Sequence, residues 1–238
     1  MLEAHDIERL LVIMAHPDDV DFGSAGTVAN LTDQGVHVTY CLVTDGDAGG
    51  FDPGITRPEM AMIRRREQCA AAKVLGVEDV IFLGHPDGRV VADLELRRDL
   101  SRVIREVRPT VVLTQSPERN YDRIFASHPD HVAVGEAAMC AIYPDSRNQF
   151  AFPELLDEGH EPWTVREAWL STHPTPGDVV DVTDQVERKL EALAHHASQL
   201  PQPDAVMERV RAWMQHTAKA FGLPEGRSAE AYRVVVTA

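Results

Sequence analysis

Two short clusters of metal-capable side chains lie far apart in the sequence. They are His16-Pro17-Asp18-Asp19 and His128-Pro129-Asp130-His131. Histidine and carboxylate groups suit borderline divalent ions, and three protein ligands with one open position are typical of a catalytic zinc site. Taken singly, either cluster could equally form a turn or cap a helix. A pair of clusters at two strand ends favours a metal site over that structural interpretation.

The segments around the clusters alternate between strand and helix patterns. Strands are predicted at 10–15, 36–44, 80–83 and 109–115, and helices at 22–34, 58–75 and 93–107. This alternation predicts an α/β fold with a mostly parallel sheet and helices on both faces. Ligands of such sheets bind outside the carboxyl ends of the strands, so we expect the metal site at that edge.

The pattern is weaker beyond residue 143. Short strands are predicted at 166–171, 179–182 and 232–237, and helices at 185–199 and 205–221. We predict one domain spanning 1–238, with a smaller C-terminal portion from about residue 144 packed on the sheet. A chain of this length can bury a core of ordinary size without disulfides.

Composition narrows the classes of partner. The formal charge of −15 and the pI near 5.1 disfavour nucleic acid and anionic membranes, which need basic patches. No apolar run is long enough for membrane insertion, and the first nine residues lack a signal-peptide pattern. Three cysteines form an odd and sparse set, typical of a reducing compartment, so a cytoplasmic location is predicted.

The two clusters and several other segments resemble the PIG-L/LmbE family of zinc-dependent de-N-acetylases. The further matching segments are 64–67, 70–76, 82–84, 87–88, 198–199 and 229–233, so the resemblance covers nearly the whole chain. It implies a Rossmann-like sheet with zinc at its edge. It also implies hydrolysis of the acetamide of an N-acetylglucosamine-containing or related small molecule.

By matched position, the resemblance implies that His16, Asp19 and His131 hold one zinc ion per chain, other divalent ions being possible. It makes Asp18 the general base. The chemistry agrees with these roles. Zinc lowers the pKa of a bound water from 15.7 towards roughly 7, and a neighbouring carboxylate can take up the proton and pass it to the leaving amine.

The resemblance assigns four more residues. His128 would face the scissile carbonyl, where its protonated form could stabilise an oxyanion together with the metal, and Asp130 would stand behind a histidine and orient it. Arg64 and Asp87 match positions that contact the sugar, although an arginine at a charged helix start is more often solvated.

Two other histidine motifs are discounted. His85 begins a third His-Pro-Asp, which we interpret as a turn. His195 and His196 lie in a predicted helix with no partner carboxylate pattern, so surface or core roles are expected.

Two alternatives remain open at this stage. One is an amidase of the same family acting on a thiol conjugate or an antibiotic, with the same ligands and a different pocket. The other is a Rossmann-like ligand-binding module without catalysis, against which the carboxylate of Asp18 argues, because binding alone needs no base. A homo-oligomer is possible.

Overall fold

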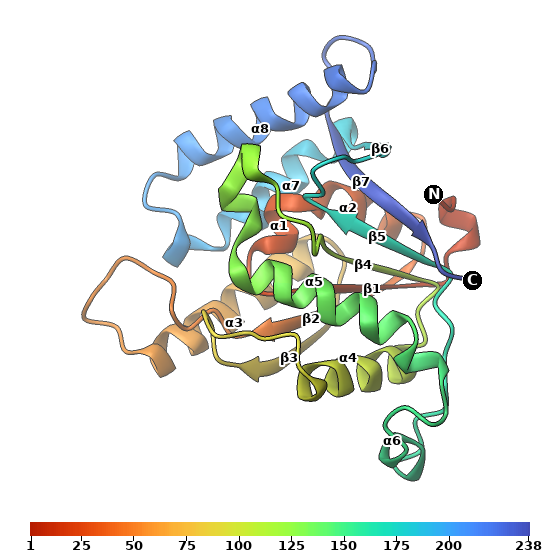
Figure 1. Cartoon of the computed structure of the whole chain (residues 1–238). Helices are drawn as coiled ribbons and strands as arrows, with labels where there is room; N and C mark the ends of the chain where they lie inside the picture. The colour runs from red at the N-terminus through yellow and green to blue at the C-terminus, as the bar shows by residue number, and fades with distance from the viewer.

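The computed structural model describes residues 1–238 and contains one seven-stranded sheet in the order β3-β2-β1-β4-β5-β7-β6 (Figure 1). The strands are β1 (Arg9–Met14), β2 (His37–Thr44), β3 (Asp79–His85), β4 (Val111–Gln115), β5 (Glu167–Ser171), β6 (Asp178–Asp181) and β7 (Ala229–Val236). Strands β1 to β5 run parallel to one another, and β7 runs antiparallel to both β5 and β6. The predicted α/β class with a mostly parallel sheet is confirmed.

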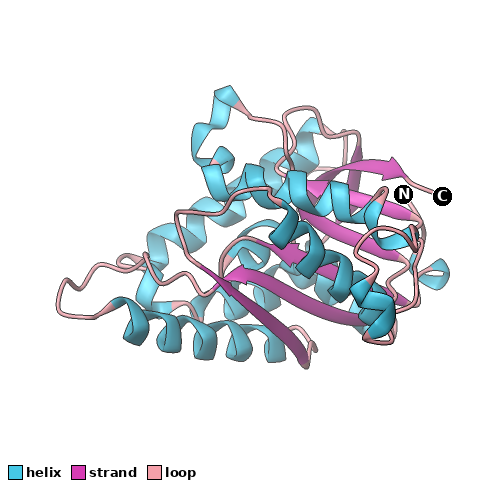
Figure 2. Cartoon of the chain, turned by 60° about the horizontal axis from the view of Figure 1, so that its bottom comes forward, coloured by secondary structure: helices cyan, strands magenta, loops and turns pink.

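Helices cover both faces of this sheet (Figure 2). They are α1 (Asp19–Gly23), α2 (Ala25–Asp33), α3 (Arg57–Val74), α4 (Leu94–Val107), α5 (Pro129–Ile142), α6 (Glu154–Asp157), α7 (Val186–Ala194) and α8 (Pro203–Ala220). One face carries α2, α3 and α7, and the other carries α4 and α5. Helix α8 packs on α7 through a separate apolar cluster. None of the helices is both long and apolar enough to cross a membrane.

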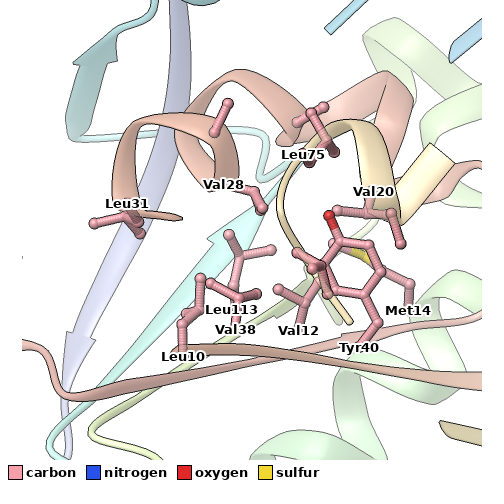
Figure 3. Packing of buried hydrophobic residues seen from close by; sticks show 14 of the residues in the cluster. Leu10, Val12, Met14, Val20, Val28, Leu31, Val38, Tyr40, Leu75 and Leu113 are labelled. Atoms are coloured by element: carbon pink, nitrogen blue, oxygen red, sulfur yellow. The ribbon is translucent and has the colours of Figure 1, made fainter. Parts of the chain in front are cut away.

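After Arg9, strand β1 is apolar because both of its faces are buried. Leu10, Val12 and Met14 point into the core under α2 and α3 (Figure 3). Leu11 and Ile13 point to the other face, under α4 and α5. A continuous apolar run is typical of a central parallel strand. This central position holds the segment that follows Met14 on a rigid support.

Two predicted helices differ from the observed ones. The predicted helix at 22–34 is split at Ser24, whose φ of −145° and ψ of 6° are not helical, so α1 and α2 are separate. The predicted helix at 185–199 ends at Ala194 and is followed by a short 3-10 helix, Ala197–Gln199. This second break releases His196 from helical geometry.

The C-terminal portion continues the same sheet. Trp169 of β5 and Tyr232 of β7 belong to the apolar cluster that also contains β1 side chains. The division at about residue 144 stays a prediction.

Candidate metal centre and active site

The two histidine clusters meet where the strand order reverses. Strands β1 and β4 are adjacent and parallel, while their neighbours β2 and β5 lie on opposite sides. The crevice at such a reversal is the usual ligand site of doubly wound sheets. The side chain of Gln115, at the end of β4, accepts a hydrogen bond from the Ala15 N–H at 3.0 Å and ties the two strand ends together.

His16, Asp19 and His131 form a compact triad. His16 Nδ1 lies 3.2 Å from His131 Nε2 and 3.3 Å from Asp19 Oδ2, and His131 Nε2 lies 3.1 Å from Asp19 Oδ1. Ligands at 2.0–2.1 Å from a tetrahedral zinc ion are separated from one another by about 3.3 Å. The two ring nitrogens have this separation, and each lies at the same range from one oxygen of the Asp19 carboxylate, so the triad suits a zinc-sized ion.

The other ring nitrogen of His16 faces two carboxylates. His16 Nε2 lies 3.1 Å from Asp87 Oδ1 and 3.3 Å from Asp130 Oδ2. Backbone amides hold both acids, since Ala48 N–H donates to Asp87 and Gly88 N–H donates to Asp130. Carboxylates on the far nitrogen of a ligand histidine fix its tautomer and orientation. The two carboxylates therefore leave Nδ1 of His16 turned towards Asp19 and His131.

Other combinations of these side chains could also hold an ion. Ligand atoms of His16, His128 and His131 lie within 4.8 Å of one another, and so do those of His16, Asp87 and Asp130. The second set uses Nε2 of His16, which already contacts the two carboxylates that backbone amides hold. The structure thus contains a candidate buried His/Asp metal centre, and the tight distances favour the triad with Asp19.

Positive charge is strongly favoured at this centre. Burial opposes a charge on His16, but Asp19, Asp130 and Asp87 more than offset it and raise its pKa to about 12. Burial likewise opposes ionisation of Asp19, yet His131 and His16 hold its pKa well below the usual range. Four carboxylates, those of residues 18, 19, 87 and 130, converge here. Such a cluster suits a bound cation.

Asp18 stands beside the triad in an unusual backbone conformation. Its φ of 90° lies in the left-handed region, which non-glycine residues rarely adopt. Burial raises the pKa of its carboxyl to about 6, although the positive charge of Arg64 opposes this rise. A carboxylate with a pKa close to neutral is suited to exchange protons at pH 7.

Arg64 is buried and does not lie on a solvated helix face. Its guanidinium donates to Asp18 Oδ2 at 3.0 Å, to Gly46 O at 3.0 Å and to Pro17 O. The side chain is only 5% exposed. The guanidinium therefore binds Asp18 and its flanking loop, which argues against the alternative of a solvated arginine, and its contact with a sugar stays a prediction.

His128 lies at the open side of the centre. Its ring centroid is 5.1 Å from that of His16 and 5.4 Å from that of His131. His128 Nδ1 accepts a hydrogen bond from the Asp130 N–H, so the proton of the neutral ring resides on Nε2. Burial and the charges of the other two histidines lower the pKa of His128. The neutral ring therefore presents an N–H donor, whereas the sequence led us to expect a protonated ring.

His196 has a core role, one of the two that we expected, and it has a carboxylate partner that the sequence pattern did not reveal. His196 Nε2 lies 2.8 Å from Asp21 Oδ2, and both side chains are fully buried. Sequence spacing could not reveal a pair 175 positions apart. The available signal was Asp21 itself. It is an acid between apolar residues, and a buried acid needs a polar partner. His85 pairs with Asp99 at 3.0 Å, away from the triad.

The chain belongs to the PIG-L family. The family model described as GlcNAc-PI de-N-acetylase matches residues 11–142, which carry both histidine clusters. The family comprises deacetylases that cleave an amide bond, so the predicted class of enzyme is confirmed.

Three relatives share most of the chain. It is 32% identical to diacetylchitobiose deacetylase of Thermococcus kodakarensis over 97% of this chain and 84% of that protein. It is 31% identical to a probable N-acetyl-alpha-D-glucosaminyl L-malate deacetylase 2 of Bacillus anthracis, over 80% and 81%. The structure of N,N'-diacetylchitobiose deacetylase from Pyrococcus horikoshii superposes with a TM-score of 0.90 at 31% identity, over 98% and 85%.

Proposed function

We propose that this chain is a zinc-dependent de-N-acetylase that hydrolyses the acetamide of an N-acetylglucosamine-containing small molecule. The observation that carries the proposal is the His16–Asp19–His131 triad, with donor atoms 3.1–3.3 Å apart, beside the buried carboxylate of Asp18. Zinc in the triad would act as a Lewis acid on the scissile carbonyl and its attacking water. Other divalent ions of similar preference could replace it.

The protein's own residues account for the proton movements. Asp18, ionised above its pKa of about 6, accepts a proton from the attacking water and later delivers it to the leaving nitrogen. Amines leave poorly unless protonated, so this second transfer matters as much as the first. Arg64 holds the carboxylate of Asp18 in place through one guanidinium nitrogen.

Charge on the carbonyl oxygen needs a donor as the tetrahedral intermediate forms. His128 supplies an N–H at Nε2, because its Nδ1 is occupied as an acceptor. An uncharged donor held in place before the reaction stabilises an oxyanion without reorganisation. Asp130 serves both histidines: its backbone N–H fixes His128 and its carboxylate fixes His16.

The substrate is an acetamido sugar by likeness to the relatives, which carry the names diacetylchitobiose and N-acetylglucosaminyl malate deacetylase. Arg64 and Asp87 border this site, and sugar contacts by their remaining polar atoms are part of the proposal. Three free cysteines accord with a reducing, cytoplasmic setting. The two alternatives are an amidase acting on thiol conjugates or antibiotics and a binding module. The acetate-release assay described next distinguishes both from a sugar deacetylase.

The test is acetate release by purified, zinc-loaded protein. The panel contains N-acetylglucosamine, diacetylchitobiose, N-acetylglucosaminyl malate, an inositol-linked N-acetylglucosamine, an N-acyl thiol conjugate and a simple acetyl ester. We expect acetate from at least one acetamido sugar and little from the ester. Asp18→Asn, equally loaded, is the matched control. Zinc-loaded wild type that releases no acetate from any sugar would overturn the proposed function.

A further inference from the structure

A line of buried side chains runs from the end of α7 to the backbone of Asp18. His196 Nε2 contacts Asp21 Oδ2 at 2.8 Å, and the same oxygen accepts a hydrogen bond from Gln68 Nε2 at 2.9 Å. Gln68 Oε1 in turn accepts the Asp18 N–H at 2.9 Å. His196, Asp21 and Gln68 have no exposed surface. None of the three touches the triad directly in the contacts described above.

The last contact falls on the strained residue of the site. Asp18 has φ 90° and ψ −24°, a conformation that costs a non-glycine residue of order 1–3 kcal/mol and persists only when its surroundings enforce it. Its N–H is bound by Gln68 alone. Release of this N–H would let the backbone relax and swing the carboxylate away from the triad.

The side-chain amide of Gln68 can have only one orientation. Its amide NH₂ must face the carboxylate of Asp21, so its carbonyl must face Asp18. His196 Nε2 contacts the same oxygen of Asp21, Oδ2, so two side chains together hold this carboxylate oxygen in place. The direction of every hydrogen bond in the line is therefore determined.

The segment containing His196 is fastened to the same helix that carries Gln68. Glu67 of α3 accepts the Ser198 N–H at 2.8 Å and the Ser198 hydroxyl at 2.7 Å. The Ser198 hydroxyl also accepts from the Gln199 side chain at 2.8 Å. The segment 198–199, one of those that resemble the family, thus holds the turn after α7 against α3.

We propose that Gln68, Asp21 and His196 are positioning residues that hold the backbone of Asp18 in its left-handed conformation and thereby aim its carboxylate. The inference rests on the proposed function for its catalytic consequence. Its structural part, the restraint on the Asp18 backbone, stands independently of any activity.

The structural part is tested by amide hydrogen exchange of the metal-free protein, followed by NMR at the Asp18 N–H. Gln68→Met has nearly the same size but lacks both hydrogen bonds. We expect exchange at Asp18 to be at least about tenfold faster in this variant than in wild type, because the N–H loses its acceptor. Unchanged protection of the Asp18 amide in folded Gln68→Met would overturn the proposal.

Glu167→Met is the matched control for loss of buried hydrogen bonds. Glu167 also makes two, to the Leu2 N–H and to the Trp169 indole N–H, but at the amino end of β5, the opposite edge of the sheet. It should lower thermal stability without changing exchange at Asp18 or kcat. Faster Asp18 exchange in both variants would indicate general loosening and overturn the specific restraint.

The catalytic part is tested by kinetics of the zinc-loaded variants. Gln68→Met should keep zinc and KM and lose about 10- to 100-fold in kcat, the scale of a small misplacement of a reacting group. In an Asp18→Asn background the same substitution should cost almost nothing, because it acts through that carboxylate. Additive losses in the double variant would overturn the proposal.

Replacement of the histidine gives a rescue experiment. His196→Gln places an amide N–H close to the former Nε2 and should keep most of kcat, whereas His196→Met removes the donor and should resemble Gln68→Met. Equal losses in both variants, at equal zinc content, would contradict the role of His196. Wild type with a protected Asp18 amide but no acetate release would refute only the proposed function.

Discussion

Two of the buried polar clusters in this molecule differ in charge balance. Lys189 and Glu230 pair at 2.6 Å with side chains 0% and 2% exposed. Glu230 also accepts from the Gly26 and Thr27 amides, and Lys189 donates to a backbone carbonyl. One cation meets one anion, and the remaining acceptors are filled.

The centre around His16 has no such balance. Several carboxylates surround the histidines, a left-handed aspartate stands beside them, and His128 is exposed at one side. Burial and ion pairing are common to both clusters, so neither identifies a functional site. Excess negative charge, strain and an open side distinguish the proposed catalytic centre, since structural pairs gain nothing from them.

The largest effect should follow removal of a triad ligand. We expect His131→Ala to lose its zinc, about one ion per chain, and with it all measurable activity, because two remaining donors bind zinc weakly. Elemental analysis after gel filtration measures this. Full zinc content in His131→Ala and in His16→Ala would contradict the triad.

The paired aspartates should separate binding from chemistry. Asp18→Asn should keep zinc and lose 10²–10⁴ in kcat, roughly the worth of a placed general base, because an amide cannot accept the proton. Asp19→Ala should bind zinc weakly and regain part of its activity with added zinc. The reverse pattern of metal content would exchange the two roles.

His128→Ala should retain zinc and lose roughly 10²–10³ in kcat, the scale of one oxyanion donor. Its KM should change little, since the donor acts on charge that develops only in the transition state. Steady-state kinetics at matched zinc content provide the measurement. A loss confined to KM would make His128 a substrate-binding residue.

Arg64→Ala should have a smaller effect, on the order of tenfold to a hundredfold in kcat, the scale of a lost hydrogen bond to a charged group. KM should also rise if the sugar is bound here. Because Arg64 lowers the pKa of Asp18, its removal should raise that pKa and shift the acidic limb of the pH–rate profile to higher pH. An unshifted limb with only a higher KM would leave Arg64 a sugar contact alone.

The balanced cluster should affect stability and leave catalysis intact. Glu230→Gln leaves Lys189 buried and unpaired, a change that costs about 3–5 kcal/mol in comparable cases. We expect a lower Tm with zinc content and kcat unchanged below the transition. If this variant lost zinc at a temperature where the protein stays folded, the two clusters would not have separate roles.

Much of the fold followed from local patterns. The apolar run of β1 predicted a strand buried on both faces, and the alternation of strands and helices predicted the parallel sheet. Both inferences depend on residues close together in the chain, because the spacing of apolar residues along a segment reflects which of its faces are buried. The breaks at Ser24 and after Ala194 were missed, because each depends on packing against other elements.

The amino-acid sequence by itself determined the two histidine clusters, their positions at strand ends and the membership of a deacetylase family. Only the tertiary structure decided which groups each cluster faces. It placed Asp87 against His16, buried Arg64 on Asp18 and joined His196 to Asp21. Strand order and the packing of α7 on α3 bring these distant partners together, and no local spacing encodes such contacts.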